Sequence, residues 1–277
     1  MTATSLPQPD PDESIFVEGL RASGHDVAVV AWDDASIDWS VFDLAVIRST
    51  WNYVHHLDAF RTWLAQVSSS TRLWNPADAV LWNLDKRYLS ELAAQGIPTV
   101  PTQFVGQEDE PPSSAILGAF DDVVIKPAVS AGSFTTDRFR MGEFGERARA
   151  QAFLDVHRQT RVMMVQPYQT SIDHEGERSL VFIDGKLTHT MKKRPRFLSG
   201  PIAIEGPIPS SQAEVELAAR VLKRFAGRLL YARVDLVPSA SGDLQLMELE
   251  ITEPYLMLDH CSAALQALVS AVCDRLR

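Results

Sequence analysis

Near the end of the chain, two short apolar segments carry acidic residues at positions where a buried strand would carry Val or Leu. This stretch, RVDLVPSASGDLQLMELE, spans residues 233–250. Side chains alternate between the two faces of a strand, so the pattern predicts a β-hairpin with one charged and one apolar face. A turn centred on Ala240-Ser241 would place Arg233 opposite Glu248. Four charged side chains then share a face: Arg233, Asp235, Glu248 and Glu250.

Three carboxylates on one face of a hairpin repel one another unless a cation lies between them. Mg²⁺ prefers such hard oxygen ligands, taking one or two carboxylates together with phosphate oxygens and water. The spacing therefore indicates a metal site formed by Asp235, Glu248 and Glu250. The alternative is a charged face that only contacts water, and the spacing alone leaves both open.

Net charge and cysteine content exclude some classes of function and cellular location. The chain has 277 residues and a formal net charge of −10, which argues against sequence-independent binding of nucleic acid. It leaves room for a small anionic ligand held by a local basic cluster. Cys261 and Cys273 are the two cysteines, a number typical of reduced thiols in a cytoplasmic protein. No apolar run approaches 18 residues, so we expect neither export nor membrane insertion.

The order of apolar segments predicts three lobes, at residues 1–80, 81–165 and 166–277. The first alternates short strands (25–34 and 41–47) with helices (12–23 and 56–67), as in a parallel α/β unit. The second and third carry a helix near 84–95, a strand ending at Lys126, a helix near 142–159 and a strand near 161–168. A hairpin turning at Asp184-Gly185, a helix near 212–226 and a final helix near 260–276 follow. The fold class is therefore α/β, with α+β lobes.

Two basic features are candidates for phosphate binding. Lys126 ends an apolar strand and precedes the small-residue loop AVSAGSF, whose backbone N–H groups can approach phosphate oxygens closely. The loop lacks the Walker pattern, and taken alone an ordinary turn after a strand-end lysine is the favoured explanation. The densest basic cluster is Lys192, Lys193, Arg194 and Arg196.

Taken in order, these features resemble the ATP-grasp superfamily over residues 80–277. The matching pieces are Lys86, Lys126-Pro127 with SAGSF, MVQPY (164–168), GERSLVFIDGK (176–186), Asp235, and Glu248-x-Glu250. In front of them, WDDASIDWSVFDLAVIRSTWNY and LWNPADAVLWNLDKRYL resemble the branch that includes D-cycloserine synthetase, which cyclises O-ureidoserine. The chain opens with MTATSLPQPDPDE, where the family's first strand has normally already ended.

The resemblance implies a fold with a substrate lobe, a lid lobe and a C-terminal lobe that binds ATP and Mg²⁺. It implies metal ligands at Asp235, Glu248 and Glu250, although Glu250 stands where the family usually has Asn. It also implies phosphate contacts from Lys192 or Lys193 and stabilisation of the reacting centre by Arg233. The implied nucleotide-binding residues are Lys86, Lys126, Ser130, Ala131, Gly132, Ser133, Gln166, Pro167, Tyr168, Asp173 and Glu177.

The first lobe offers a candidate substrate site. Arg48, Ser49 and Thr50 directly follow a predicted parallel strand, and ligands bind beyond the carboxyl ends of such strands. Arg48 is therefore a candidate bidentate clamp for a substrate carboxylate, with Trp51 and Tyr53 as walls. The alternative is an ion-paired arginine beside packing aromatics.

The function predicted by the resemblance is ATP-dependent ligation. A substrate carboxylate attacks the γ-phosphorus, and an amine-type nucleophile then displaces phosphate from the acylphosphate, with release of ADP. Nucleophile and carboxylate belong to one molecule in a cyclo-ligase. A phosphotransferase and a non-catalytic nucleotide-binding regulator remain alternatives. We expect a small, amino-acid-like substrate and neither nucleic acid nor membrane as partner, and the sequence leaves a homodimer open.

Overall fold

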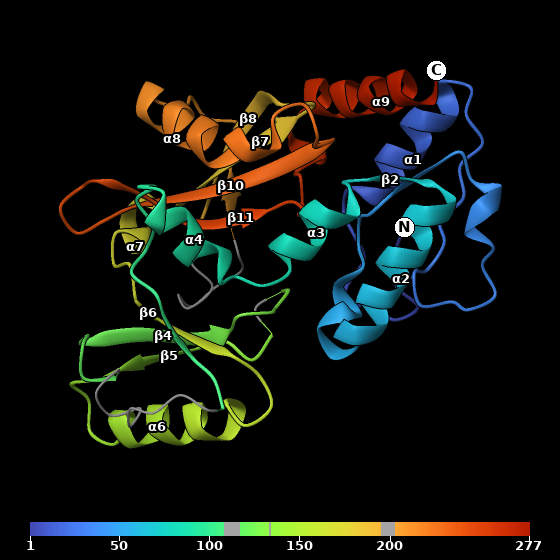
Figure 1. Ribbon diagram of the computed structural model, residues 1–277. Helices are drawn as coiled ribbons and strands as arrows, with labels where there is room; N and C mark the ends of the chain where they lie inside the picture. Colours follow the sequence, from blue (N-terminus) through green and yellow to red (C-terminus); the bar gives the residue numbers. More distant parts are fainter. Residues whose placement is uncertain (108–116, 133, 195–202) are drawn as a thin grey trace.

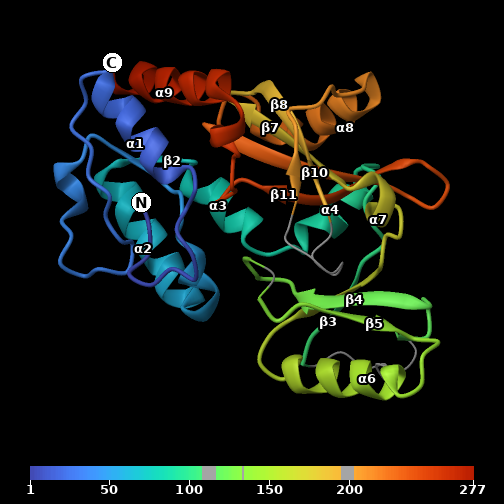
Figure 2. The same ribbon diagram turned by 180° about the vertical axis from the view of Figure 1, so that it is seen from behind.

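The computed structural model describes residues 1–107, 117–132, 134–194 and 203–277. Figure 1 shows three lobes, and Figure 2 shows them from behind. The N-terminal lobe lies beside a five-stranded sheet, and a smaller sheet with helix α6 (Glu146–His157) lies below that sheet. None of the helices in these residues is long and apolar enough to cross a membrane.

The N-terminal lobe is built on two parallel strands. β1 (Leu44–Val46) pairs with β2 (Arg72–Trp74), and α2 (Leu57–Ser70) packs against them. The predicted strand at 25–34 is wrong, because this segment forms only a single parallel bridge, between Ala31 and Thr2. Val29 within it is 42% exposed, so the apolar run is not buried as expected. Of the residues predicted to form the apolar face of α2, Leu57 is half-buried and four are buried: Phe60, Trp63, Leu64 and Val67.

The opening residues lie beside β1. Thr2 N donates to Val30 O at 2.9 Å, and the amino group of Met1 donates to Val46 O at 2.7 Å. The backbone of Met1 and Thr2 thus bridges β1 and the 30–32 segment.

The C-terminal lobe is an antiparallel sheet in the order β11-β10-β7-β8-β9. The turn at Asp184-Gly185 joins β7 to β8, as predicted. α4 and α8 form one hydrophobic core with the sheet. α1 and α9 form a second core with the sheet, and the residues of β7 alternate between the two cores. The bounds are β7 Glu177–Ile183, β8 Lys186–Lys193, β9 Ile204–Glu205, β10 Tyr231–Pro238, β11 Leu244–Glu250, α1 Glu13–Ala22, α4 Tyr88–Ala94, α8 Gln212–Leu222 and α9 Ser262–Leu276.

The helix predicted over 84–95 is divided. α3 (Ala77–Asn83) ends before it, residues 84–87 form a turn, and α4 begins at Tyr88. The backbone N–H of Lys86 in this turn donates to Ala128 O at 2.9 Å. The break therefore brings the turn against the lid lobe.

The lid lobe is a separate antiparallel sheet in the order β3-β6-β4-β5. Its strands are β3 (Gln103–Val105), β4 (Asp122–Pro127), β5 (Asp137–Arg140) and β6 (Met163–Pro167). α6 closes its own core by packing Ala150 and Leu154 against the sheet. The predicted lobe boundary at 165 falls within β6, whose hydrogen bonds belong to the lid sheet.

Two buried asparagines tie the segment after β2 to the β10–β11 hairpin. Asn75 Nδ2 donates to Tyr231 O at 2.9 Å and Ile251 O at 2.7 Å, while its Oδ1 accepts from Leu230 N at 2.7 Å. Asn83 likewise donates to Leu249 O at 2.7 Å. Buried amides need such partners, so these side chains fix the hairpin against the N-terminal lobe.

We predict that Asn75→Ala lowers the free energy of unfolding by at least about 2 kcal/mol, since it leaves three buried backbone groups without a partner. Urea denaturation measures this. The control is Gln66→Ala on the exposed face of α2, with an expected change within about 0.5 kcal/mol. Equal effects of the two substitutions would show that the amide does not tie the lobes.

Candidate active site

The four charged side chains predicted for the β10–β11 hairpin share one face of the C-terminal sheet. The predicted register is wrong. Arg233 pairs with Glu250, and Asp235 pairs with Glu248. Two features shift it: the loop between Pro238 and Leu244 is centred on Ser241, and a β-bulge after Asp235 leaves Met247 as an extra residue on β11.

Arg233 and Asp235 form a buried ion pair. Arg233 Nη2 lies 2.8 Å from Asp235 Oδ2. Arg233 is 6% exposed and Asp235 is 1% exposed. Asp235 also accepts from Ser179 Oγ at 2.6 Å and from Lys193 Nζ at 3.3 Å. Burial alone would raise the pKa of Asp235, but Arg233 and Lys193 outweigh it and hold the pKa below its usual range. Arg233 makes a further ion pair with Glu250.

Glu248 forms ion pairs with two lysines from different lobes. Lys86 Nζ lies 3.0 Å from Oε1, and Lys126 Nζ lies 3.7 Å from Oε2. Lys86 also donates to Ser130 O at 2.9 Å and to Ser130 Oγ at 3.2 Å. At 6% exposed, Lys86 is not a solvated helical lysine. The turn before α4, the lid strand β4 and the hairpin thus converge on one carboxylate.

The small-residue loop after β4 lies against the N-terminal lobe. Ala131 packs against the core of that lobe, and Phe134 makes an edge contact with His55, with ring centroids 4.7 Å apart. Gly132 has φ +58°, a left-handed conformation that favours glycine. Ser133 lies outside the described residues.

Of the two predicted phosphate-contacting lysines of β8, only Lys193 joins the ionic network. Lys193 pairs with both Glu177 and Asp235. Lys192 points the other way, as successive residues of a strand do, and its Nζ is 3.5 Å from His174 O. Arg196 lies outside the described residues.

The residues predicted to contact the adenine and ribose lie at the junction of the lid and C-terminal lobes. Gln166 is buried on β6 and donates to Thr102 Oγ1 at 2.9 Å. Pro167 ends that strand. Tyr168 donates its hydroxyl hydrogen to Asp173, and the guanidinium of Arg138 lies 3.3 Å from the centre of its ring.

The three predicted substrate-binding residues are buried. Arg48 is 4% exposed, and its Nη2 lies 3.0 Å from Asp12 Oδ2 and 3.6 Å from Asp10 Oδ2. Both carboxylates contact Nη2, whereas Nε and Nη1 of Arg48 are buried and have no hydrogen-bond partner within the described ranges. Ser49 Oγ donates to Thr2 Oγ1 at 3.0 Å, whereas Thr50 Oγ1 is buried without a hydrogen-bond partner among the described residues.

The sequence alone did not single out Glu253, which follows β11 by three residues. Trp51 Nε1 donates to its backbone oxygen at 3.2 Å. Burial, reinforced by the charge of Glu250, raises the pKa of Glu253 to about 8. The available signal was a third glutamate close behind the Glu248-x-Glu250 pattern.

No cluster of three or more metal-ligating His, Cys, Asp or Glu side chains is formed by the part of the chain that the structure describes. The acidic face is instead balanced by lysine and arginine side chains. The oxygen donors are of the kind that Mg²⁺ prefers, and Glu248 and Glu250 are less enclosed than Asp235.

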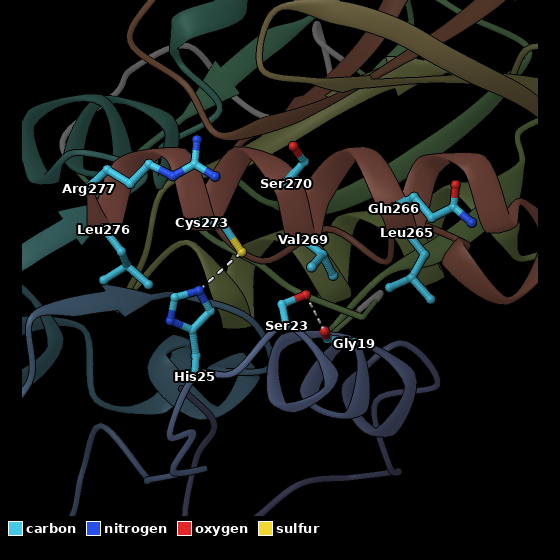
Figure 3. Close-up of a pocket in the computed structure, with 10 residues that line it drawn as sticks. All are labelled: Gly19, Ser23, His25, Leu265, Gln266, Val269, Ser270, Cys273, Leu276 and Arg277. Carbon is cyan, nitrogen blue, oxygen red and sulfur yellow. Dashed lines mark hydrogen bonds between the residues drawn. The ribbon is translucent and has the colours of Figure 1, made fainter.

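A surface pocket lies away from this network, between α1 and α9 (Figure 3). His25 and Cys273 face each other across it, with Nε2 and Sγ 3.2 Å apart. None of the sequence-predicted site residues lines it.

Known proteins share this architecture. A family model described as the N-terminal domain of D-cycloserine synthetase DcsG matches residues 1–75. The cycloserine biosynthesis protein DcsG of Streptomyces lavendulae is 30% identical over 296 residues, which cover 99% of this chain and 97% of that protein. The chain belongs to the DcsG family.

Solved structures agree with this assignment. The crystal structure of D-cycloserine synthetase DcsG superposes with a TM-score of 0.87 at 28% identity, covering 100% of this chain and 98% of that one. A RimK-domain ATP-grasp protein from Sphaerobacter thermophilus has a TM-score of 0.68 at 17% identity, with 95% of each chain covered. The predicted fold and enzyme class, an ATP-grasp ligase, are confirmed.

We predict that Arg233→Met lowers the free energy of unfolding by about 3–5 kcal/mol, because it leaves Asp235 buried without its main counter-charge. Arg87→Met is a matched control, since Arg87 pairs with Asp85, also two residues away, but its side chain is 60% exposed against 8% for Arg233. We expect a change within about 1 kcal/mol for that control. Equal losses in urea denaturation would contradict a structural role for the buried pair.

Proposed function

We propose that this protein is an ATP-dependent ligase that joins a carboxylate to an amine-type nucleophile of a small, amino-acid-like substrate and releases ADP and phosphate. The observation that carries the proposal is the convergence of Lys86 and Lys126 on Glu248, at the positions where the ATP-grasp pattern requires phosphate-binding lysines and a metal-binding acid. Intramolecular ligation, as in a cyclo-ligase, is the form that family membership favours.

The basic side chains of the network bind and orient the polyphosphate in this proposal. Lys86 and Lys126 exchange the carboxylate of Glu248 for phosphate oxygens, which a compact ammonium group suits. Arg233 and Lys193 are already held by Asp235, so they add positive charge at fixed positions beside the reacting carboxylate. Such fixed charge stabilises the negative charge that develops during phosphoryl and acyl transfer.

The acidic face has the donor chemistry of a Mg²⁺ site. Glu248 and Glu250 would hold the ion, with Asp235 completing the set if Arg233 and Lys193 release it. Bound there, Mg²⁺ would neutralise phosphate charge. The segment Arg48-Ser49-Thr50 would border the substrate. Its contribution is the buried positive charge of Arg48 rather than an exposed clamp.

An ADP-release screen tests the function. The purified chain is incubated with ATP, MgCl₂ and either O-ureidoserine, D-alanine or another amino acid, and the nucleotides are separated by chromatography. We expect ADP with a carboxylate substrate, and a hydroxamate when hydroxylamine is added to trap the acylphosphate. AMP as product would exclude the proposed chemistry, and ADP without a trappable hydroxamate would favour a phosphotransferase.

Lys126→Ala is expected to weaken ATP binding by about 1.5–3 kcal/mol, the value of a hydrogen bond to a charged group. Isothermal titration calorimetry with MgATP measures it. Lys186→Ala, at an exposed lysine of β8, is the control and should leave the affinity unchanged. Unchanged affinity in Lys126→Ala would remove this lysine from the nucleotide site.

Two isosteric changes separate metal binding from folding. Glu248→Gln should abolish Mg²⁺-dependent ADP formation and lower the melting temperature only modestly, since Lys86 loses its counter-charge but keeps its hydrogen bonds to Ser130. Asp235→Asn should also lower the melting temperature, because Asp235 is the buried partner of Arg233 and Lys193. Near-normal turnover in Glu248→Gln would mean that the hairpin's acids do not hold the metal.

A further inference from the structure

We infer that Tyr88 is a positioning residue for the proposed metal-binding acids of the β10–β11 hairpin. Its hydroxyl keeps the backbone between Glu248 and Glu250 in place while Lys86 changes its partner. The inference rests on the proposed function and goes beyond it, because neither the ATP-grasp pattern nor the ion pairs of the site include Tyr88.

The hydroxyl of Tyr88 makes two hydrogen bonds to a single residue of β11. It donates to Leu249 O at 3.0 Å, and it accepts from Leu249 N at 2.9 Å. Tyr88 is 2% exposed and Leu249 is 1% exposed, so both bonds are shielded from water. Leu249 lies directly between Glu248 and Glu250, whose backbone positions therefore depend on this contact.

The contact replaces a missing strand. β11 is the first strand in the order of its sheet, and among the described residues no strand lines its outer side along Leu249. Buried backbone groups need hydrogen-bond partners, and an edge strand has to find them elsewhere. Tyr88 supplies them at Leu249, and Asn83 Oδ1 accepts from Ile251 N at 3.0 Å. The tyrosine hydroxyl thus serves as donor and acceptor in the way that a neighbouring strand would.

Tyr88 lies two residues after Lys86, and the two side chains contact adjacent positions of β11. Lys86 Nζ lies 3.0 Å from Glu248 Oε1, whereas the Tyr88 hydroxyl bonds the next residue, Leu249. In the proposed reaction Lys86 exchanges Glu248 for phosphate oxygens, so this ion pair is lost when the nucleotide binds. The hydroxyl is neutral and takes no part in that exchange. It therefore keeps the hairpin in place beside the turn after the ion pair has gone.

A fixed backbone matters here because the side chains of the proposed ligands are not themselves enclosed. Glu248 and Glu250 are half-buried, so packing alone does not set their positions. Mg²⁺ demands a nearly ideal octahedral arrangement of oxygen ligands. Groups that orient the ligands of a metal are typically worth about 10–100-fold in metal affinity or activity. The Tyr88 hydroxyl acts on both glutamates at once, through the residue between them.

Tyr88→Phe tests the role, because it removes the hydroxyl and keeps the ring beside Trp82, with ring centroids 4.9 Å apart. Isothermal titration calorimetry measures the affinity for ATP, once with excess MgCl₂ and once with EDTA. We expect the ratio of the two affinities to fall about tenfold. The affinity in EDTA should stay within about twofold of the wild type, because Lys86 and Lys126 still supply the phosphate contacts.

Turnover gives a second readout that a merely structural residue would not move. With the substrate that yields ADP in the screen, the Mg²⁺ concentration for half-maximal rate should rise about tenfold in Tyr88→Phe. The rate at saturating Mg²⁺ should stay within about threefold of the wild type, since a group that only orients a ligand acts on metal binding.

Tyr231→Phe is the matched control. Tyr231 is 1% exposed, and its hydroxyl also contacts backbone groups, the oxygens of Ile47 and Thr252. Neither of these residues is adjacent in the chain to a proposed metal ligand. We expect a lower melting temperature in both variants and a changed Mg²⁺ dependence in Tyr88→Phe alone.

A measurement on the unaltered protein covers the case in which Tyr88→Phe does not fold. Amide hydrogen exchange at Leu249, followed by NMR, should be slow in the free protein. It should be equally slow with ADP and MgCl₂ present, because the hydroxyl still accepts from this N–H. Fast exchange in the presence of the nucleotide would show that the contact does not persist, and would overturn the inference.

The outcomes are distinct. An unchanged affinity ratio in Tyr88→Phe, or the same change in Tyr231→Phe, overturns the role of Tyr88 while the ligase function stands. A loss of rate that saturating Mg²⁺ does not restore has the same meaning. A wild-type protein that binds ATP no better with Mg²⁺ than with EDTA, and forms no ADP, overturns both proposals. A loss confined to Mg²⁺-dependent binding in Tyr88→Phe supports the assignment.

Discussion

A charge can be buried only beside an opposite charge, and this constraint organises the molecule. Asp235 is 1% exposed and Arg233 is 6% exposed, so each depends on the other. Glu248, on the same face, forms ion pairs with Lys86 of the turn before α4 and with Lys126 of the lid lobe. Ion pairs that balance the negative charge of this hairpin thus hold segments from different lobes together.

Local rules explain what the sequence predicted well. The alternation of strand side chains placed Arg233, Asp235, Glu248 and Glu250 on one face, and the residue pair Asp184-Gly185 marked a hairpin turn. The predicted register was wrong because the turn is centred on Ser241 and because Met247 is an extra residue on β11. The bulge changes the phase of the alternation, so Leu246 and Leu249 face the same core.

Tertiary contacts explain what the sequence missed. Lys86 has the sequence neighbours of an ordinary helical lysine. It is buried by contacts with residues more than 40 positions away, namely Ala128, Ser130 and Glu248. Arg48 was predicted as a clamp for a ligand, and no feature of the sequence indicates that Asp12, 36 residues before it, accepts a hydrogen bond from it. Asp12 in turn accepts from the backbone N–H groups of Leu256 and Leu258, at 2.7 and 2.8 Å. Such pairings depend on the assembled lobes, which periodicity does not describe.

The double pairing of Glu248 has a consequence for nucleotide selection. Under the proposed function its carboxylate would compete with the nucleotide, since it pairs with both lysines proposed to bind phosphate. A nucleotide that arrives without a cation frees Glu248 from its lysines and leaves that carboxylate unbalanced beside a polyanion. A nucleotide that carries Mg²⁺ brings the replacement counter-charge with it. Glu248 would then exchange its two lysines for the metal ion with little change in local charge balance. The protein would therefore discriminate between the metal-complexed and the metal-free forms of the same nucleotide.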